Sequence, residues 1–227
     1  MKKFSILYVL FFSICFSKQD IYNIKLYGMN VAKCYVEVRD TVIANTDCLN
    51  LKYDVHSTSF MKFFFNVVNS YETIIDKNTL NILYFKKNTV QPGINNELET
   101  IYNENFVRYQ NSDYSINDGE YNIFSLLYFL TKNKNNEFLN ELKIDREGKK
   151  YLCTIRNDKK DFLYSLNFKP VDVNDMGLIK HTDIFTWALF LNNTEKTIGV
   201  NPNNNTIDYC KFKKGLMNFV AKRVETN

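Results

Sequence analysis

The residue types that most often perform catalysis or bind metals are sparse in this chain. There are only two histidines, His56 and His181. A metal site needs several converging ligands, and neither histidine has a ligand partner at a metal-binding spacing. Ser125 lies in a predicted helix and lacks the glycine-flanked turn that exposes a hydrolase nucleophile. We therefore expect no catalytic residue, metal or cofactor. A hydrolase is our third hypothesis, and it would need His56 or His181 beside a Ser, Cys or Asp in a pocket.

The first residues have the composition of a secretory signal peptide. Lys2 and Lys3 precede an apolar or hydroxyl run over residues 4–16, which is shorter than the roughly 20 residues that span a bilayer. Small residues at Cys15 and Ser17 predict cleavage after Ser17.

A lipoprotein anchored through Cys15 is the alternative, but the bulky Ile14 occupies a position where that signal has a small residue. We thus expect a signal peptide over 1–17 and a single domain over 18–227. The protein would be exported, and periplasmic if its source is a bacterium with two membranes. No later segment is long and apolar enough to form a transmembrane helix.

The charge distribution argues against a nucleic-acid partner. The whole chain carries a net charge of +4, which falls to about +2 without Lys2 and Lys3, and basic and acidic residues are interspersed. A nucleic-acid-binding surface would show a concentrated basic stripe.

Four cysteines follow the leader, namely Cys34, Cys48, Cys153 and Cys210. Export permits disulfides, and four cysteines allow three pairings. Cys34 and Cys48 lie on strands that would form one hairpin, so a bridge between them is one hypothesis. The other is that the cysteines are small apolar residues packed in the sheet.

The elements that must position any site are mostly strands. Ala32, Cys34, Val36 and Val38 alternate with polar residues, which predicts a strand with one apolar face. Further β-rich runs follow at intervals of about ten residues, a spacing typical of an antiparallel sandwich or barrel. Residues 182–191 are apolar at nearly every position and predict a strand that is covered on both faces.

One segment, Asn122–Lys132, predicts a helix instead. Ile123, Leu126, Leu127 and Leu130 share one helical face, and Asn122 can cap the first turn. We expect a mainly β fold, a single curved antiparallel sheet forming a barrel or half-barrel, with this one principal helix (about 122–132) packed on it.

The chain contains 19 Phe and 15 Tyr, many of them within the predicted strands. Core packing explains most of them, but a curved sheet can also leave a cleft for an acyl chain or another apolar ligand. The residues that we expect to line such a cleft are Phe63, Phe64, Phe65, Phe85, Leu127, Phe185 and Trp187. Our leading hypothesis is therefore a non-enzymatic envelope protein that binds a lipid or apolar small molecule. The alternative is an envelope protein–protein interaction module that uses an exposed sheet edge at residues 97–109.

Several segments resemble an exported bacterial family, domain of unknown function 3108. They are Tyr22–Gly28, Asn69–Thr73, the helix from Asn122 to Leu130, Trp187–Asn192 and the closing hairpin from Ile207 to Val224. The match covers nearly all of the chain after the leader. It departs from the family where an Asp that caps the family's helix is here Asn122, and a usual glycine is here Ala32. The resemblance implies a periplasmic, β-rich protein with one embedded helix, and it implies no known activity.

Overall fold

The computed structural model describes residues 18–102, 106–109, 112–115, 121–132, 141–158, 162–172, 178–179 and 181–224. The expected signal peptide lies outside these ranges. The described strands form one antiparallel sheet in the order β8-β7-β6-β5-β4-β3-β2-β1-β14-β13-β12-β11-β10-β9. The first strand is therefore central, because β1 pairs with β2 on one side and with β14 on the other.

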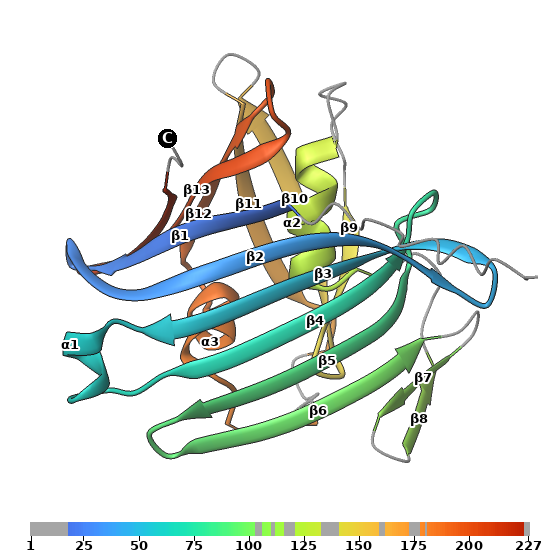
Figure 1. The fold of residues 1–227 in the computed structure, drawn as a ribbon, viewed down its shortest axis with the longest axis horizontal. Coiled ribbons are helices and arrows are strands. Elements are labelled where there is room, and N and C mark those ends of the chain that lie inside the picture. The colour runs from blue at the N-terminus through green and yellow to red at the C-terminus, as the bar shows by residue number, and fades with distance from the viewer. Residues whose placement is uncertain are drawn as a thin grey trace, which may run out of the picture.

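The sheet has two runs in which strands that follow one another in the chain are also neighbours in the sheet (Figure 1). The first run is β1 (Lys18–Leu26), β2 (Met29–Ile43), β3 (Thr46–Ser57), β4 (Val68–Asp76), β5 (Ile82–Gln91), β6 (Ile94–Tyr102), β7 (Phe106–Tyr109) and β8 (Ser112–Ser115). The second is β9 (Leu142–Arg146), β10 (Lys149–Asp158), β11 (Leu163–Pro170), β12 (Glu195–Asn201), β13 (Thr206–Lys214) and β14 (Met217–Arg223).

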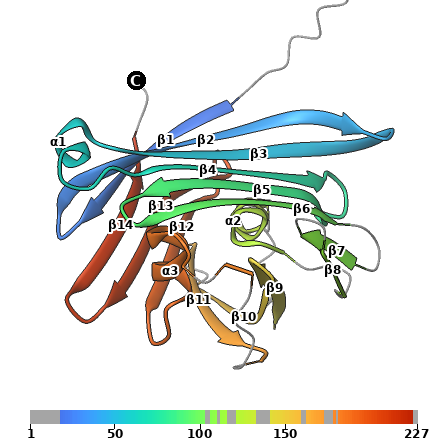
Figure 2. The same ribbon diagram turned by 90° about the horizontal axis from the view of Figure 1, so that it is seen from below.

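The sheet curls so that the two runs face each other. In Figure 2, β1–β6 form one wall, β9–β14 form the other, and the helices α2 (Ile123–Lys132) and α3 (Ile184–Phe190) lie between them. Strand β9 ends the sheet at one side and β8 at the other, and the order of strands does not close into a ring. The prediction of a curved antiparallel sheet with a packed principal helix is confirmed.

Helix α2 begins where the sequence predicts. The backbone N–H of Ser125 donates to Asn122 Oδ1 at 2.9 Å, and the N–H of Asn122 donates back to Ser125 Oγ at 3.1 Å. Asn122 Nδ2 also donates to Thr73 Oγ1 on β4 at 3.0 Å. An Asp at this position lacks the N–H donor, so Asn122 ties the start of the helix to β4 as well as capping it.

The predicted strand over residues 182–191 is wrong, because most of this segment forms the helix α3. Asp183 caps it, accepting from the N–H of Thr186 at 3.0 Å. Six of the seven residues of α3 are apolar, a composition that suits a short packed helix as well as a doubly covered strand, so hydropathy alone did not distinguish helix from strand. The Asp-x-x-Thr cap is the signal that could have done so.

A third helix, α1 (Ser59–Lys62), connects β3 to β4 at one end of the sheet. None of its residues is buried. Among the described helices, none has the length and hydropathy needed to cross a membrane.

Candidate functional site

A cavity of about 380 Å³ lies inside the curve of the sheet, which we call cavity 1. Its walls come from β1, β2, β3, β13 and β14, with α2 along one side and α3 at another. Most of the lining is apolar, including Ile24, Val36, Val55, Phe124, Leu127, Phe185 and Phe212. Polar side chains gather where β1, the end of α2 and the turn before β13 meet, namely Asp20, Lys132, Asn204, Asn205 and Thr206. The cavity therefore has an apolar interior and a polar border.

A second cavity of about 270 Å³, cavity 2, continues toward the end of the sheet that carries α1. Its walls include Leu26, Val31, Met61, Phe65 and Phe219. Five residues line both cavities, namely Ile24, Val55, Phe185, Phe212 and Ala221. The two spaces are therefore neighbours that share part of their walls.

The alternation that predicted the β2 strand also describes the cavity wall. Cys34, Val36 and Val38 line cavity 1, and Ala32 lines cavity 2. Tyr22, Ile24 and Leu26 on β1 follow the same period of two and were missed by the sequence analysis. Their alternation was the signal that could have found them.

Polar groups on these walls are mostly paired within the protein. Tyr22 donates its hydroxyl to the carbonyl of Ile207 at 2.8 Å. Burial raises the pKa of Tyr22 and of Tyr53 above the ordinary tyrosine range, so both stay neutral at any physiological pH. Two buried amide oxygens have no hydrogen-bond partner among the described residues, Asn205 Oδ1 in the lining of cavity 1 and Asn69 Oδ1 in that of cavity 2. Each can accept a bond from a ligand hydroxyl or amine.

The structure brings three of the seven predicted lining residues to the cavities. Leu127 lines cavity 1, Phe65 lines cavity 2, and Phe185 lines both. Phe85 is buried but packs its ring on that of Phe124, with centroids 5.9 Å apart, and does not border either space.

The other three predicted residues line neither cavity 1 nor cavity 2. Phe63 is 88% exposed and Phe64 66% exposed, because they follow α1 at the end of the sheet instead of entering a strand. Trp187 is 45% exposed, because α3 is a helix and its outer face points away from the interior. The prediction took these side chains as part of a cleft in the curved sheet, whereas Phe63 and Phe64 lie outside the strands and Trp187 lies on a helix.

A Cys34–Cys48 disulfide does not form in this structure, in which both cysteines are free. They do lie on paired strands, as predicted, but Cys34 pairs with Val55 whereas Cys48 pairs with Thr41. These positions are seven residues apart along the ladder, or about 23 Å at 3.3 Å per residue. A disulfide needs Cα atoms within roughly 7 Å.

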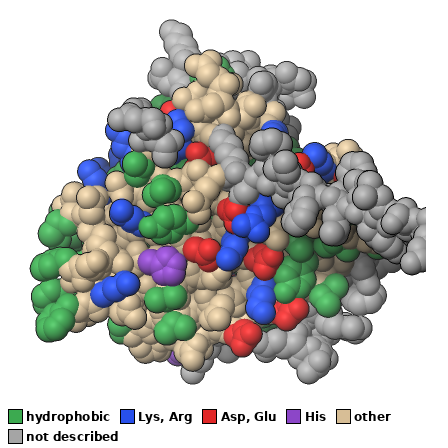
Figure 3. Space-filling view, viewed as in Figure 1, with side chains coloured by type: hydrophobic (Ala, Val, Ile, Leu, Met, Phe, Trp, Pro, Cys, Tyr) green, Lys and Arg blue, Asp and Glu red, His purple; other side chains and the backbone are tan. Residues whose placement is uncertain are grey.

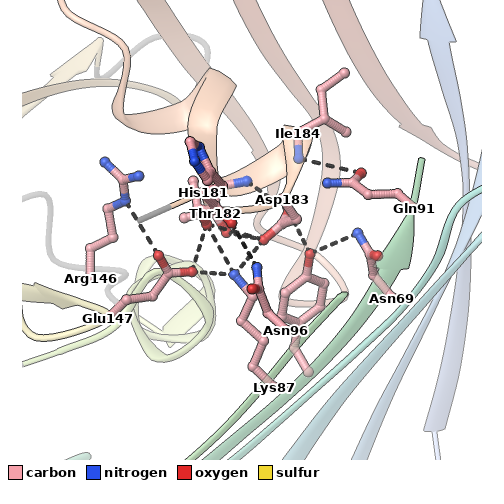
Figure 4. A network of polar contacts seen from close by, with 12 residues as sticks. Asn69, Lys87, Gln91, Asn96, Arg146, Glu147, His181, Thr182, Asp183 and Ile184 are labelled. Carbon is pink, nitrogen blue, oxygen red and sulfur yellow. Dashed lines mark hydrogen bonds and ion pairs between the residues drawn. The ribbon is translucent and has the colours of Figure 1, made fainter. Parts of the chain in front are cut away.

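The open side of the sheet holds a cluster of buried charges, which we call the seam network (Figure 4). Lys87 on β5 is 1% exposed, and its ammonium contacts Asp183 Oδ2 at 2.6 Å, Glu147 Oε1, and Thr182 Oγ1 at 3.0 Å. Tyr71 on β4 donates to Asp183 Oδ1 at 2.7 Å. These contacts join β4 and β5 to the turn after β9 and to the start of α3, where the ladder does not continue.

Each buried charge in the network is matched by opposite charge and hydrogen bonds. Burial alone would raise the pKa of Asp183, but Lys87 and the hydrogen bonds from Thr186 outweigh it and hold that pKa below its usual range. Burial, followed by the Asp183 charge, raises the pKa of Tyr71 well above its usual value. Asp183 is therefore ionised and Tyr71 neutral at pH 7.

The conformation of the turn between β9 and β10 positions the Glu147 carboxylate. Glu147 has a φ of +53°, a region that non-glycine residues enter at a cost of about 1–3 kcal/mol, and Gly148 follows at +84°. Two successive residues with positive φ are typical of the tight type I′ hairpin turn. The side chain of Glu147, 6% exposed, thereby reaches Lys87 across the seam.

The hydrolase hypothesis finds no support in these cavities. Neither His56, His181 nor Ser125 lines cavity 1 or cavity 2. The Ser125 hydroxyl donates to the carbonyl of Asn122 at 3.1 Å within the helix cap. Among the described residues, no group of three or more His, Cys, Asp or Glu side chains could hold a metal ion.

The proposed interaction edge is partly covered by neighbouring strands. Strand β6 pairs with β5 from Ile94 to Ile101, and with β7 from Thr100 to Tyr102. Strand β7 in turn pairs with β8. The interaction role of residues 97–109 stays a prediction.

The fold and its cavities define an open, β-barrel-like protein with an apolar interior. A solved structure of this class supports that description, a β-barrel-like protein of domain of unknown function DUF1849 from Brucella abortus. It aligns with a TM-score of 0.51 and 8% identity over 91% of this chain and 95% of that one, so the likeness concerns the fold alone. Neither a family model nor a curated protein matches the sequence. The resemblance to domain of unknown function 3108 stays a prediction.

Proposed function

We propose that this chain is an exported, non-enzymatic binding protein that holds a lipid acyl chain or a similar apolar ligand in the curve of its sheet. Cavity 1 carries the proposal. Its volume of about 380 Å³ falls within the range of small-molecule sites, and its walls are apolar with polar groups at one border. An amphipathic ligand matches this distribution.

Helix α2 forms one wall of cavity 1 and does not fill the concave side of the sheet. Its buried residues Leu126 and Leu130 belong to the packed core, whereas Leu127, Tyr128 and Thr131 turn toward cavity 1. Cavity 2 extends the apolar space past Phe185. Because the two cavities share part of their walls, a chain longer than cavity 1 would extend toward cavity 2.

Native mass spectrometry and solvent extraction of the purified protein test the proposal. We expect a co-purifying apolar molecule, or saturable uptake of a fluorescent fatty acid. The variant Ala221→Phe places a ring where Ala221 borders both cavities, and should abolish uptake.

Val220→Phe is the matched control. Val220 is the adjacent residue on β14 and does not line either cavity, since neighbours on a strand point to opposite faces. Absence of any bound or exchangeable apolar molecule in the wild type would refute the proposal, as would equal uptake by Ala221→Phe and Val220→Phe.

A further inference from the structure

One end of the molecule exposes large apolar side chains from three separate connections. They are Tyr27 in the β1–β2 turn and Met29 at the start of β2, Phe60, Phe63 and Phe64 in and after α1, and Leu216 in the β13–β14 turn. We call this set the apolar tip. Figure 3 shows hydrophobic side chains gathered at the end where α1 lies in Figure 1.

Backbone hydrogen bonds hold the three connections together. The N–H of Tyr27 donates to the carbonyl of Asn218 at 3.3 Å, which joins the first turn to β14. The N–H of Thr58, the residue that caps α1, donates to the carbonyl of Val31 at 3.0 Å, which joins α1 to the start of β2. The apolar tip is therefore one surface of the fold.

The exposure of the apolar tip is large for a protein in water. Phe63 is 88% exposed and Leu216 is 91% exposed. The rings of Phe60 and Phe64 lie 5.3 Å apart, and those of Phe63 and Phe64 lie 5.4 Å apart, so the aromatic side chains form a cluster. A cluster of exposed aromatic side chains rimmed by polar residues marks a surface that binds a partner or a membrane.

The charges around the apolar tip select between these partners. Residues 21–36, 56–71 and 209–224 contain no Asp or Glu, although the chain has 25 of them. The same segments supply exposed Lys25, Lys62, Lys213 and Lys214. Aromatic residues flanked by lysines suit the interface of a bilayer with anionic headgroups.

The opposite end of the sheet has a different character. There the β2–β3 hairpin exposes Val42 and Ile43, but Asp40 and Asp47 flank them. The ladder places Glu195 of β12 opposite Lys213, but the exposed lysines at this end outnumber it. The combination of exposed aromatic side chains and net positive charge thus distinguishes the end with α1.

We propose that the apolar tip docks on the surface of an anionic lipid bilayer. Met61 and Phe65, which lie among the tip residues of α1 and its connection, also line cavity 2, as do Leu26 and Val31 beside Tyr27. Docking would bring cavity 2 next to the membrane, where an apolar ligand can pass between bilayer and protein. The docking inference stands on the tip itself and does not require that the cavities hold a ligand.

Vesicle flotation of the chain beginning at Lys18, where β1 starts, tests the docking. We expect binding to vesicles of equal parts phosphatidylcholine and phosphatidylglycerol, and weaker binding to phosphatidylcholine alone. Phe63→Ser combined with Phe64→Ser should lower the partition coefficient by roughly tenfold or more, because it removes two interfacial aromatic rings. Val42→Ser combined with Ile43→Ser is the matched control and should change it by less than about twofold.

Lys213→Glu combined with Lys214→Glu isolates the contribution of charge. Each lysine near an anionic surface strengthens binding by about fivefold, so this variant should lose its preference for phosphatidylglycerol. Lys143→Glu combined with Lys169→Glu, on β9 and β11, makes the same change of net charge away from the apolar tip and should keep the preference. A thermal melt checks that each variant is folded.

Two outcomes would overturn the proposal. The first is that the wild-type protein floats with neither kind of vesicle, or that the Val42→Ser and Ile43→Ser control loses as much binding as the Phe63→Ser and Phe64→Ser variant. The other is a wild-type dimer in light scattering that Phe63→Ser and Phe64→Ser convert to a monomer, without vesicle binding, which would make the apolar tip a contact between two copies. Ala221→Phe should still float, so failure of ligand uptake and failure of docking are distinguishable.

Discussion

Replacing Lys87 with Met should destabilise the fold more than any other single change of a lysine, because it leaves two buried carboxylates without their positive partner. Asp183 is 0% exposed and Glu147 6% exposed, and both contact the Lys87 ammonium. Removing one partner of a buried ion pair costs about 3–5 kcal/mol. Met keeps the length and apolar volume of the lysine stem, so the loss reports on charge.

The hydrogen bonds that remain place the expected loss at the lower end of that range. Asp183 keeps three donors, namely Tyr71 Oη and the N–H and Oγ1 of Thr186. Glu147 keeps the Thr182 hydroxyl at 2.7 Å. We expect a loss of about 3 kcal/mol, which for a chain of this size lowers the melting temperature by roughly 6–12 °C.

The pH dependence separates charge from packing. In the wild type the pKa of Asp183 is lowered, so its contribution to stability is present above the unfolded pKa of about 4 and is lost as the pH falls through the folded value. In Lys87→Met, uncompensated burial raises that pKa, and the variant is penalised at pH values above about 4. The difference in unfolding free energy should therefore be larger at pH 7 than at about pH 4.

Chemical denaturation at both pH values measures this difference. Lys86→Met is the control, because Lys86 is the adjacent residue on β5 and its side chain is 39% exposed, with Nζ 4.0 Å from Glu97 Oε1. The unfolding free energy of Lys86→Met should differ from that of the wild type by no more than about 0.5 kcal/mol. Adding Glu147→Gln and Asp183→Asn to Lys87→Met should recover part of the stability. A Lys87→Met variant as stable as Lys86→Met, or a difference that does not narrow in acid, would refute the reasoning.

Three further results are expected. Asn122→Ala removes the α2 cap and the bond to Thr73, and should lower the unfolding free energy in urea by about 2–3 kcal/mol; a loss under about 0.5 kcal/mol would contradict the two contacts. Burial raises the pKa of Cys153 and of Cys210 to about 12, so both should react with a thiol reagent at pH 8 only after denaturation, and rapid labelling of the native protein would count against the packing. Burial lowers the pKa of Lys196 to about 8, so the unfolded chain binds more protons above that value and stability should rise between about pH 8 and 10, whereas Lys196→Met should lack this rise; parallel pH profiles would disprove it.

Local patterns were sufficient for the strands and for α2. The period of two in residues 32–38 predicts both the strand β2 and the face that lines the cavities. The spacing of apolar residues from Ile123 to Leu130, with Asn122 before them, predicts the helix and its cap. These signals depend only on neighbours within one turn or one strand, so a single sequence contains them.

Contacts between distant segments were not predictable in the same way. Lys87, Glu147 and Asp183 are separated by 60 and 36 positions, and each alone resembles an ordinary surface charge. Phe63 and Phe64 have the hydropathy of core residues, yet they lie in a connection at the apolar tip. Hydropathy indicates the free energy that burial of a side chain would contribute, but it does not determine whether the folded chain buries that side chain.

The amino-acid sequence by itself determined a β-rich chain with one apolar, well-capped helix, because alternation, helical spacing and capping act locally. Only the tertiary structure decided that the sheet curls without closing, that Lys87 bridges its open side, and that α2 leaves space beside Leu127. The physical reason is that curvature and cavities arise from how distant strands pack together. Whether an apolar face meets another side chain or an empty space depends on the whole sheet.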